Sequence, residues 1–379
     1  MTDEVKARKI EHVTLALEKD ISAPQQAGWH DIRFIHQALP EVNLDEIDTS
    51  VTFLGHTLSY PIFMSSLTGG HPDVMKINKN LARAAERYNV ALGVGSQRAA
   101  IVNPQLSSTY TVTRQHAPNT FLIANIGAPQ LISQDRHDPF TQEQIQQAIQ
   151  MIEANALAVH LNSLQEAAQP EGDRHTRGEV EALTALTQQL SLPVIAKETG
   201  AGICYEQAIV LRNCGIAAID VGGAGGSSMS ALEAARAQKH NDERAMNIGL
   251  LFRDWGIPTP IAVVETKQAQ LPVISTGGVR SGLDIARAIA LGATLVGIGH
   301  PFLQAASESF ERVCEVLDNM ITELKVAMQL SGSTNLQQLG NANIIVTGAT
   351  HEWLNLRGFK RELKHMSRRR WQVPPAQQS

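Results

Sequence analysis

The feature that most constrains the fold is a regular alternation of short apolar runs and helical patterns, which begins at Pro61. Apolar, β-prone runs occur at residues 61–65, 90–94, 121–125, 156–161, 193–197, 217–221, 272–276 and 294–298. Helical patterns lie between most of them, at residues 74–88, 141–155, 179–190, 205–213 and 282–291. Strands that alternate with helices indicate an α/β protein with a parallel sheet. Eight βα units predict a (β/α)8 TIM barrel; the alternative, an open doubly wound sheet, seldom has eight such even units.

The same alternation divides the chain into parts of a single domain. We predict a barrel at residues 61–330, an N-terminal extension at residues 1–60 and a helical addition after the barrel. Residues 227–249 interrupt the rhythm with charged and small residues, so we expect a long, mobile loop there that could act as a lid. Residues 302–330 predict one long helix, and the polar tail at residues 367–379 is expected to be disordered.

Composition excludes several classes of function. The 379 residues carry 32 basic and 37 acidic side chains, and the net charge of −5 argues against general nucleic-acid binding. Cys204, Cys214 and Cys314 show no CxxC spacing, which fits a reducing cytoplasm rather than a disulfide framework. The sequence shows no apolar signal segment and no apolar run of membrane-spanning length. We therefore expect a cytoplasmic protein without membrane contact.

The densest group of polar residues follows the fourth strand, between His160 and Arg174. Side chains alternate across a strand, so His160 and Asn162 are expected to share a face. Gln165 and Glu166 then offer an amide and a carboxylate side by side. The active site of a (β/α)8 barrel lies at the C-terminal ends of its strands, and such loops carry function on a rigid scaffold. A simple polar turn is the alternative for each residue, but it accounts poorly for the whole run.

Glycine-rich turns follow strands six, seven and eight, at residues 222–228, 277–281 and 299–301. Such turns expose backbone N–H groups at helix starts, where anions bind, and loops after strands seven and eight often hold a phosphate in this fold. With Arg280 beside them, the turns predict a bound phosphate group. Lys197, at the end of strand five, fits a charge partner for an anionic ring, with a structural ion pair as the alternative.

These residues predict a barrel enzyme with a phosphorylated cofactor, a second anionic ligand and one divalent metal ion, but they do not identify the reaction. Arg8 and Lys9, with His12 close by, would suit the second anion. Composition alone favours a different interpretation of that segment, as an exposed first turn of helix.

Several motifs occur together in this chain: Arg8-Lys9-x-x-His12, Thr68-Gly69-Gly70, Gly95-Ser96-Gln97-Arg98, His160-Leu-Asn162-x-x-Gln165-Glu166, Pro170-Glu171-Gly172-Asp173, Lys197-Glu198, the 222–228 loop and Gly277-Gly278-Val279-Arg280-Ser281-Gly282. They closely resemble the motifs of type 2 isopentenyl-diphosphate Δ-isomerase, the flavin-dependent form, over most of the chain. The Gly-Gly pieces are shared with many flavin barrels, whereas the block from His160 to Arg174 is specific.

The resemblance implies FMN, a divalent metal ion, usually Mg²⁺, and NADPH as the reductant of the flavin. The positions that match FMN contacts are Ser66, Leu67, Thr68, Ser96, Asn125, Lys197, Ser227, Gly278, Val279, Arg280, Gly299 and His300. Those that match substrate contacts are Arg8, Lys9, Ser96, Gln97, Arg98, His160, Asn162 and Gln165, and Glu166 matches the metal ligand. This chain has Ser227 where many relatives have threonine, and Leu67 where methionine is usual. We also expect a homo-oligomer.

The implied reaction interconverts isopentenyl and dimethylallyl diphosphate in isoprenoid biosynthesis. It adds a proton at one carbon and removes one at another, and an unactivated alkene is a poor base, so a strong acid is needed. Gln165 does not titrate usefully, whereas the reduced flavin ring could supply acid–base nitrogens. Lys197 would then stabilise negative charge on the ring, and His160 is a plausible partner of the phosphates. Gln165, Lys197 and His160 are therefore the expected catalytic residues.

Two other functions remain open. An FMN-dependent oxidoreductase could use a similar barrel: IMP dehydrogenase needs a catalytic cysteine in a loop after a strand, and Cys204 lies early in a helical pattern instead. A 2-hydroxy-acid oxidase needs a histidine base beside a late arginine, and no such motif adjoins Arg280. A non-catalytic flavin-binding sensor is the third class, against which the dense polar loop after strand four argues.

Overall fold

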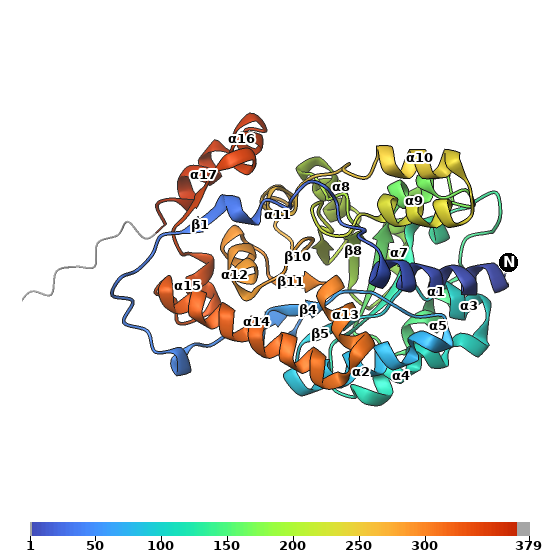
Figure 1. The fold of residues 1–379 in the computed structure, drawn as a ribbon, viewed down its shortest axis with the longest axis horizontal. Helices are drawn as coiled ribbons and strands as arrows, with labels where there is room; N and C mark the ends of the chain where they lie inside the picture. Colours follow the sequence, from blue (N-terminus) through green and yellow to red (C-terminus); the bar gives the residue numbers. More distant parts are fainter. Residues whose placement is uncertain (1, 370–379) are drawn as a thin grey trace, which may run out of the picture.

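Eight parallel strands close into a barrel in the computed structural model, which describes the backbone of residues 2–369 and the side chains of residues 10–369 (Figure 1). The strands are β4 (Ile62–Met64), β5 (Ala91–Gly93), β6 (Leu122–Gly127), β7 (Ala156–Leu161), β8 (Val194–Glu198), β9 (Ala218–Asp220), β10 (Val273–Thr276) and β11 (Leu295–Ile298). Each strand pairs with the next, and β11 returns to β4, so the barrel has no free edge. The prediction of a (β/α)8 TIM barrel is confirmed.

Helices surround this barrel (Figure 1). They are α2 (Met75–Tyr88), α3 (Arg98–Val102), α4 (Ser108–His116), α5 (Gln142–Met151), α6 (Ser163–Ala168), α7 (Glu179–Gln189), α8 (Tyr205–Asn213), α9 (Met229–Lys239), α10 (Glu243–Leu251), α11 (Thr259–Lys267), α12 (Gly282–Leu291), α13 (His300–Glu308) and α14 (Phe310–Leu330). Their ends follow capping chemistry. On α12, for example, the Ser281 hydroxyl accepts from the Asp284 amide, and Gly292, at φ 113°, ends the helix. Short 3₁₀ turns occur as η2 (Leu44–Glu46), η3 (Pro72–Val74), η4 (Pro104–Leu106) and η5 (Ala128–Leu131).

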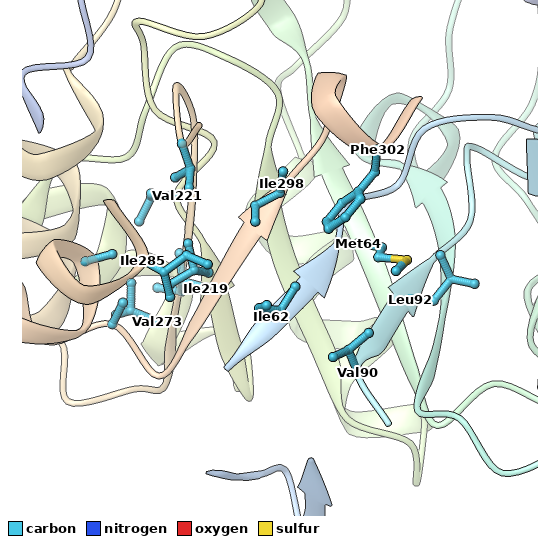
Figure 2. Packing of buried hydrophobic residues seen from close by; sticks show 14 of the residues in the cluster. Ile62, Met64, Val90, Leu92, Ile219, Val221, Val273, Ile285, Ile298 and Phe302 are labelled. Atoms are coloured by element: carbon cyan, nitrogen blue, oxygen red, sulfur yellow. The ribbon is translucent and has the colours of Figure 1, made fainter. Parts of the chain in front are cut away.

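Alternating side chains on each strand separate two packing layers. On β4, Ile62 and Met64 belong to the layer between strands and helices, and Figure 2 shows Met64 beside Phe302 of α13. Phe63 points the opposite way and joins the cluster inside the barrel. The hairpin of β2 (Val51–Phe53) and β3 (His56–Leu58) adds to that inner cluster. These apolar groups fill the barrel, so a polar site has room only at the C-terminal ends of the strands.

The mobile loop expected at residues 227–249 is wrong, because these residues form most of α9 and α10. Each helix begins at a side-chain cap: the Ser228 hydroxyl accepts from the Ala231 amide, and the Asp242 carboxylate accepts from the Ala245 amide. Glu233, one of the charged residues of this stretch, is buried in the middle of α9. A charged residue in a buried network is indistinguishable in the sequence from one on a solvated surface.

The single long helix expected at residues 302–330 is also wrong, since the chain breaks between α13 and α14. Ser309 has an extended backbone, and its hydroxyl accepts a hydrogen bond from the Arg312 amide at 3.1 Å. Serine favours such a cap because its side chain replaces a missing helical acceptor. The apolar periodicity continues across the break, which explains why it suggested one helix.

The two ends of the chain pack against the barrel and against each other. α1 (Thr2–Glu18) lies beside α9, and η1 (Trp29–Asp31) leads into β1 (Ile32–Phe34). β1 pairs antiparallel with β12 (Ile344–Val346), so the N-terminal extension and the C-terminal addition share a small sheet. The addition also contains α15 (Leu336–Gly340), α16 (Gly348–Leu356) and α17 (Lys360–Met366).

The tail differs in part from the expected disorder at residues 367–379. Arg369 donates a hydrogen bond to the Ala290 carbonyl at 2.8 Å, so the tail is anchored to the barrel up to this residue. Residues 370–379 lie outside the described part of the chain, and their disorder stays a prediction. Among the described residues, no helix has the length and apolar character needed to cross a membrane.

Candidate active site

A cavity of about 290 Å³ lies where the C-terminal ends of the barrel strands meet α1. It is lined by residues from the ends of all eight strands and by His12 of α1. The predicted site residues that line it are Ser66, Leu67, Ser96, Asn125, His160, Gln165, Lys197, Ser227, Gly278, Val279, Arg280, Gly299 and His300. Most of the residues singled out in the sequence therefore converge on one chamber.

Five predicted site residues do not line this cavity: Thr68, Gln97, Arg98, Asn162 and Glu166. Thr68 is hydrogen-bonded to the Asn78 amide oxygen at 2.5 Å. Gln97 is fully buried; its amide accepts from the Asn125 backbone at 2.9 Å and donates to the Ala148 carbonyl at 2.7 Å. Thr68 and Gln97 hold the ends of strands in place rather than facing the chamber.

Two further predicted residues, Arg8 and Lys9, fall in α1. Their backbone is helical, but their side chains lie outside the described residues. The turn of α1 that follows them is described, and it carries Glu11 and His12. Their predicted role as diphosphate ligands therefore stays a prediction.

The pairing register of the barrel aligns three polar residues side by side. His160 on β7 is level with Lys197 on β8, and Lys197 is level with Asp220 on β9. The Lys197 ammonium donates to the Asp220 carboxylate at 2.9 Å, while His160 Nδ1 lies 2.9 Å from the side-chain oxygen of Asn125. Lys197 thus forms the ion pair given above as an alternative, and it also lines the cavity. Asp220 is fully buried and was missed by sequence reasoning.

Glu198 is a second carboxylate in the cavity wall, to which sequence reasoning gave no role. One of its oxygens accepts from the amides of Gly200, Ala201 and Gly202 at 2.5, 2.5 and 3.1 Å. Burial raises the pKa of Glu198 to about 7, against the opposing effect of these hydrogen bonds and of Lys197. The signal in the sequence was the run of small residues after Glu198, whose amides can converge on one carboxylate oxygen.

Gln165 meets another buried carboxylate, Glu233 of α9. The Gln165 amide nitrogen donates to Glu233 Oε1 at 2.9 Å, and His12 Nε2 lies 3.0 Å from the same oxygen. Burial alone would raise the pKa of Glu233, but His12, Gln165 and Arg236 outweigh it and lower that pKa. Because Gln165 donates through its nitrogen to Glu233, its carbonyl oxygen is left to accept a hydrogen bond elsewhere.

Glu166 lies on α6, the short helix that follows β7. One of its oxygens accepts from Asn162 at 2.8 Å and the other from the Asp173 amide at 2.9 Å. Asp173 in turn receives Arg98 at 2.8 Å. Gly172 is required here, since a Cβ at this position would overlap the Glu166 carbonyl. Across the described residues, no group of three or more His, Cys, Asp or Glu side chains could hold a metal ion. A metal at Glu166 would therefore need most of its ligands from substrate and water.

The floor of the cavity contains hydroxyl groups that lack partners. Within the described chain, Ser65, Ser66 and Thr276 each bury a side-chain oxygen that has no hydrogen bond. Buried polar atoms are normally paired, so these atoms indicate a ligand or ordered water. Gly297 makes room for them, because a Cβ there would overlap the Thr276 hydroxyl. A planar heterocycle with several polar edges, such as a flavin, fits this floor.

Another part of the cavity suits an anion. Gly278 has φ 64°, a conformation that favours glycine, and a Cβ on Gly226 would come within 2.6 Å of the Gly278 nitrogen. The Gly278 and Val279 amides donate to no acceptor in the described part of the protein. Arg280 lines the same region and is exposed to solvent. Free amides beside a guanidinium form a phosphate-binding arrangement.

The chain matches the family described as FMN-dependent dehydrogenase over residues 3–104 and 134–346. It is 47% identical to the isopentenyl-diphosphate delta-isomerase of Methanothermobacter thermautotrophicus over 363 residues, which cover 96% of this chain and 99% of the relative. The chain belongs to the isopentenyl-diphosphate delta-isomerase family. The enzymes of the same name from Methanosarcina mazei and Archaeoglobus fulgidus are 46% and 45% identical and cover 95% and 93% of the chain, and 97% and 99% of their own lengths.

Solved structures of other proteins have the same fold as this member of the isopentenyl-diphosphate delta-isomerase family. A lactate oxidase from Pediococcus acidilactici has a TM-score of 0.64 and 17% identity, with 92% of this chain and 94% of that chain covered. A flavocytochrome b2 variant has a TM-score of 0.62 and 18% identity, with 89% and 83% covered. At such low identity the likeness shows a common barrel and nothing about the reaction.

The raised pKa of Glu198 predicts a specific pH dependence of stability. Its pKa is about 7 in the folded protein against an ordinary value of 4.5, so the folded state holds the proton more tightly. The free energy of unfolding should therefore fall as pH rises from about 4.5 to about 7. We expect Glu198→Gln to reduce this fall, measured by urea unfolding at pH 5 and pH 7.5. Glu352→Gln, on the exposed face of α16, is the control. An unchanged fall in Glu198→Gln would show that Glu198 is ionised throughout this range.

Proposed function

We propose that this chain interconverts isopentenyl diphosphate and dimethylallyl diphosphate in isoprenoid biosynthesis. Relatives at 45–47% identity over nearly the whole chain carry the name isopentenyl-diphosphate delta-isomerase. The observation that carries the proposal is the convergence of Gln165, Lys197 and His160 on one cavity. His160 and Gln165 come from the block between His160 and Arg174 that is specific to the isomerase, and Lys197 comes from the Lys197-Glu198 motif.

FMN is the proposed cofactor, as the family match suggests. The free amides of Gly278 and Val279, together with Arg280, would hold its phosphate, and the unpaired hydroxyls of Ser65 and Thr276 would meet the edge of its ring. Bound reduced FMN would supply acid–base nitrogens beside the reacting carbons. NADPH is the proposed reductant, and we also propose a cytoplasmic location and a homo-oligomer, all three as expected from the sequence.

Lys197 would provide positive charge beside the ring. Its ammonium is held at 2.9 Å by the buried Asp220 carboxylate, which fixes its direction. A fixed charge of this kind stabilises an anion without reorganisation during the reaction. His160, aligned with Lys197 across the strands, would contact the diphosphate or the ring from the neighbouring position.

Gln165 would lie against the reacting carbons of the substrate. Glu233 fixes the amide nitrogen, so the amide cannot rotate freely, and the carbonyl oxygen is the group left to face the cavity. An amide in this position orients a proton donor without competing with it as a base. The buried Glu233 carboxylate, whose pKa is lowered, keeps the amide in this orientation near neutral pH.

The diphosphate would lie between α1 and the loop after β7. Arg8, Lys9, Ser96 and Arg98 are the proposed ligands. Arg98 donates one N–H to Asp173, and a guanidinium has five donors in all, so others remain for a phosphate. Mg²⁺ is the proposed metal ion, held by Glu166 together with diphosphate oxygens and water, because Mg²⁺ often binds one or two carboxylates and a substrate phosphate.

The direct test is conversion of isopentenyl diphosphate by purified protein supplied with FMN, Mg²⁺ and NADPH under anaerobic conditions. The ¹³C spectrum of labelled substrate should show dimethylallyl diphosphate accumulating with time. Omission of FMN should abolish the reaction after the protein has been stripped of flavin. Unchanged substrate in the complete mixture would reject the proposed function.

Arg280→Ala should weaken FMN binding, because a charge-assisted contact with phosphate contributes roughly 1.5–3 kcal/mol, or about 10- to 150-fold in Kd. Quenching of flavin fluorescence during titration of the apoprotein measures the Kd. Arg312→Ala, which removes an exposed arginine of α14 that is not among the cavity-lining residues, should leave the Kd unchanged. Equal affinities for Arg280→Ala and the parent would remove Arg280 from the phosphate site.

Glu166→Gln separates two roles for a buried carboxylate. As a metal ligand, it should raise the Mg²⁺ concentration needed for half-maximal rate by about tenfold or more, while the Kd for FMN stays the same. As a loop brace alone, it should lower the melting temperature and leave the Mg²⁺ requirement unchanged, because its contacts with Asn162 and Asp173 are internal. The second result would contradict the proposed metal site.

A further inference from the structure

We propose that Arg236 of α9 is a positioning residue that fastens α1 to the mouth of the cavity. It binds three carboxylates that come from different parts of the chain: Glu11 of α1, Glu171 of the loop after β7 and Glu233 of α9. We call these four side chains the Arg236 clasp. The role of the clasp in diphosphate binding rests on the proposed function, whereas its role in holding α1 does not.

The geometry of the clasp is specific to arginine. Nε lies 3.1 Å from Glu11 Oε2, while Nη1 lies 2.5 Å from Glu171 Oε1 and 3.3 Å from Glu233 Oε2. Only the planar fork of a guanidinium presents donors in several fixed directions at once. A lysine ammonium at this position would keep the charge but would not reach all three acceptors from one point.

Burial makes the clasp stronger than an ordinary surface ion pair. The side chains of Arg236, Glu11 and Glu233 are 15%, 10% and 1% exposed. Burial alone would lower the pKa of Arg236, but Glu171 and Glu233 outweigh it and raise that pKa. Burial would likewise raise the pKa of Glu11, but hydrogen bonds from His240, Lys239 and Arg236 instead hold it below the ordinary value. The pKa values of Arg236 and Glu11 are therefore both shifted toward the ionised form by their partners.

Removal of Arg236 would do more than delete an attraction. Three carboxylates from three segments would then face one another without the central cation, and like charges at short distance repel. Lys239 and His240 would still contact Glu11, at 3.2 and 3.1 Å, but they approach from the solvent side and are more than half exposed. His12 would still lie 3.0 Å from Glu233 Oε1.

The clasp connects α1 with the amide that faces the cavity. Glu233 receives Arg236 on one oxygen, and Gln165 together with His12 on the other. Among the described side chains of α1, Glu11 and His12 are the two with ion-pair partners, and both converge on this point. The C-terminal turn of α1 is anchored separately, where the Ala16 carbonyl meets His300 at 3.1 Å. Arg236 is thus placed to control the preceding turns, where Arg8 and Lys9 lie.

The test compares Arg236→Met with Arg312→Met. The second variant makes the same substitution in an exposed ion pair on α14. In the flavin-loaded parent and variants, hydrogen–deuterium exchange is followed for the backbone amides of residues 2–18. Arg236→Met should accelerate this exchange at least tenfold and leave the barrel strands protected, while Arg312→Met should change neither. Arg236→Lys should fall between the parent and Arg236→Met, because charge is kept without the fork.

Two further readouts distinguish a clasp from general loss of structure. The double variant Arg236→Met/Glu11→Gln should exchange more slowly in α1 than Arg236→Met, because one of the facing carboxylates is gone. In the isomerase assay, Arg236→Met should raise the KM for isopentenyl diphosphate about tenfold with an unchanged Kd for FMN. If Arg236→Met does not fold, Glu11→Gln alone must accelerate exchange in α1, since it removes the α1 arm.

The outcomes separate the two proposals. Unchanged exchange in α1 for Arg236→Met, or for Glu11→Gln where the first does not fold, overturns the clasp. Faster exchange with an unchanged KM overturns the positioning role in substrate binding. A parent that shows no isomerase activity rejects the proposed function, but the exchange measurement still decides whether Arg236 holds α1.

Discussion

The register of the closed parallel barrel is the constraint on which the site depends. Closure brings the carboxyl ends of eight strands to one rim, and strand pairing places His160, Lys197 and Asp220 level with one another. A shift of one residue in β8 would turn Lys197 away from the cavity and into the packing between strands and helices. The inner apolar cluster at the other end of the barrel resists such a shift, because every strand contributes side chains to it. The chemistry of the rim is therefore fixed by packing some distance below it.

The polar groups of the cavity are of two kinds: some have no hydrogen-bond partner, and others are held firmly by a charged neighbour. In the described residues, the buried hydroxyls of Ser65, Ser66 and Thr276 lack hydrogen-bond partners, so they are available to bind a ligand. Lys197 and Glu233 are instead held by buried or charged neighbours, which fixes their direction. A site that keeps its charges rigid and leaves its neutral donors free can bind a polar ring without rearranging. The same logic extends to α1, whose only described ion pairs converge on the edge of this cavity.

The sequence predicted the barrel well, because eight apolar runs of strand length can be recognised without knowledge of tertiary contacts. It also predicted most of the cavity lining, since residues at the ends of consecutive strands must meet. It failed where a residue's partner lies far along the chain. Residues 227–249 were predicted as a mobile loop although Glu233 within them is buried, because its partners, His12 and Gln165, are 221 and 68 residues away in the sequence. Asp220 was overlooked for the same reason. A single aspartate within a β-prone run does not indicate that Lys197 lies beside it on the neighbouring strand. The break at Ser309 was missed because a side-chain cap leaves the apolar period intact.

The isomerisation for which this family is named involves no net oxidation, whereas proteins with a similar barrel include oxidases. Redox balance therefore distinguishes an isomerase from an oxidoreductase most directly. An isomer has the oxidation state of its substrate, so a reductant is needed only to prepare the enzyme. The measurement is the number of dimethylallyl diphosphate molecules formed per NADPH oxidised in a sealed, oxygen-free cuvette. The account predicts many products for each NADPH, and dithionite should replace NADPH entirely. One product per NADPH would contradict it and return this chain to the oxidoreductases.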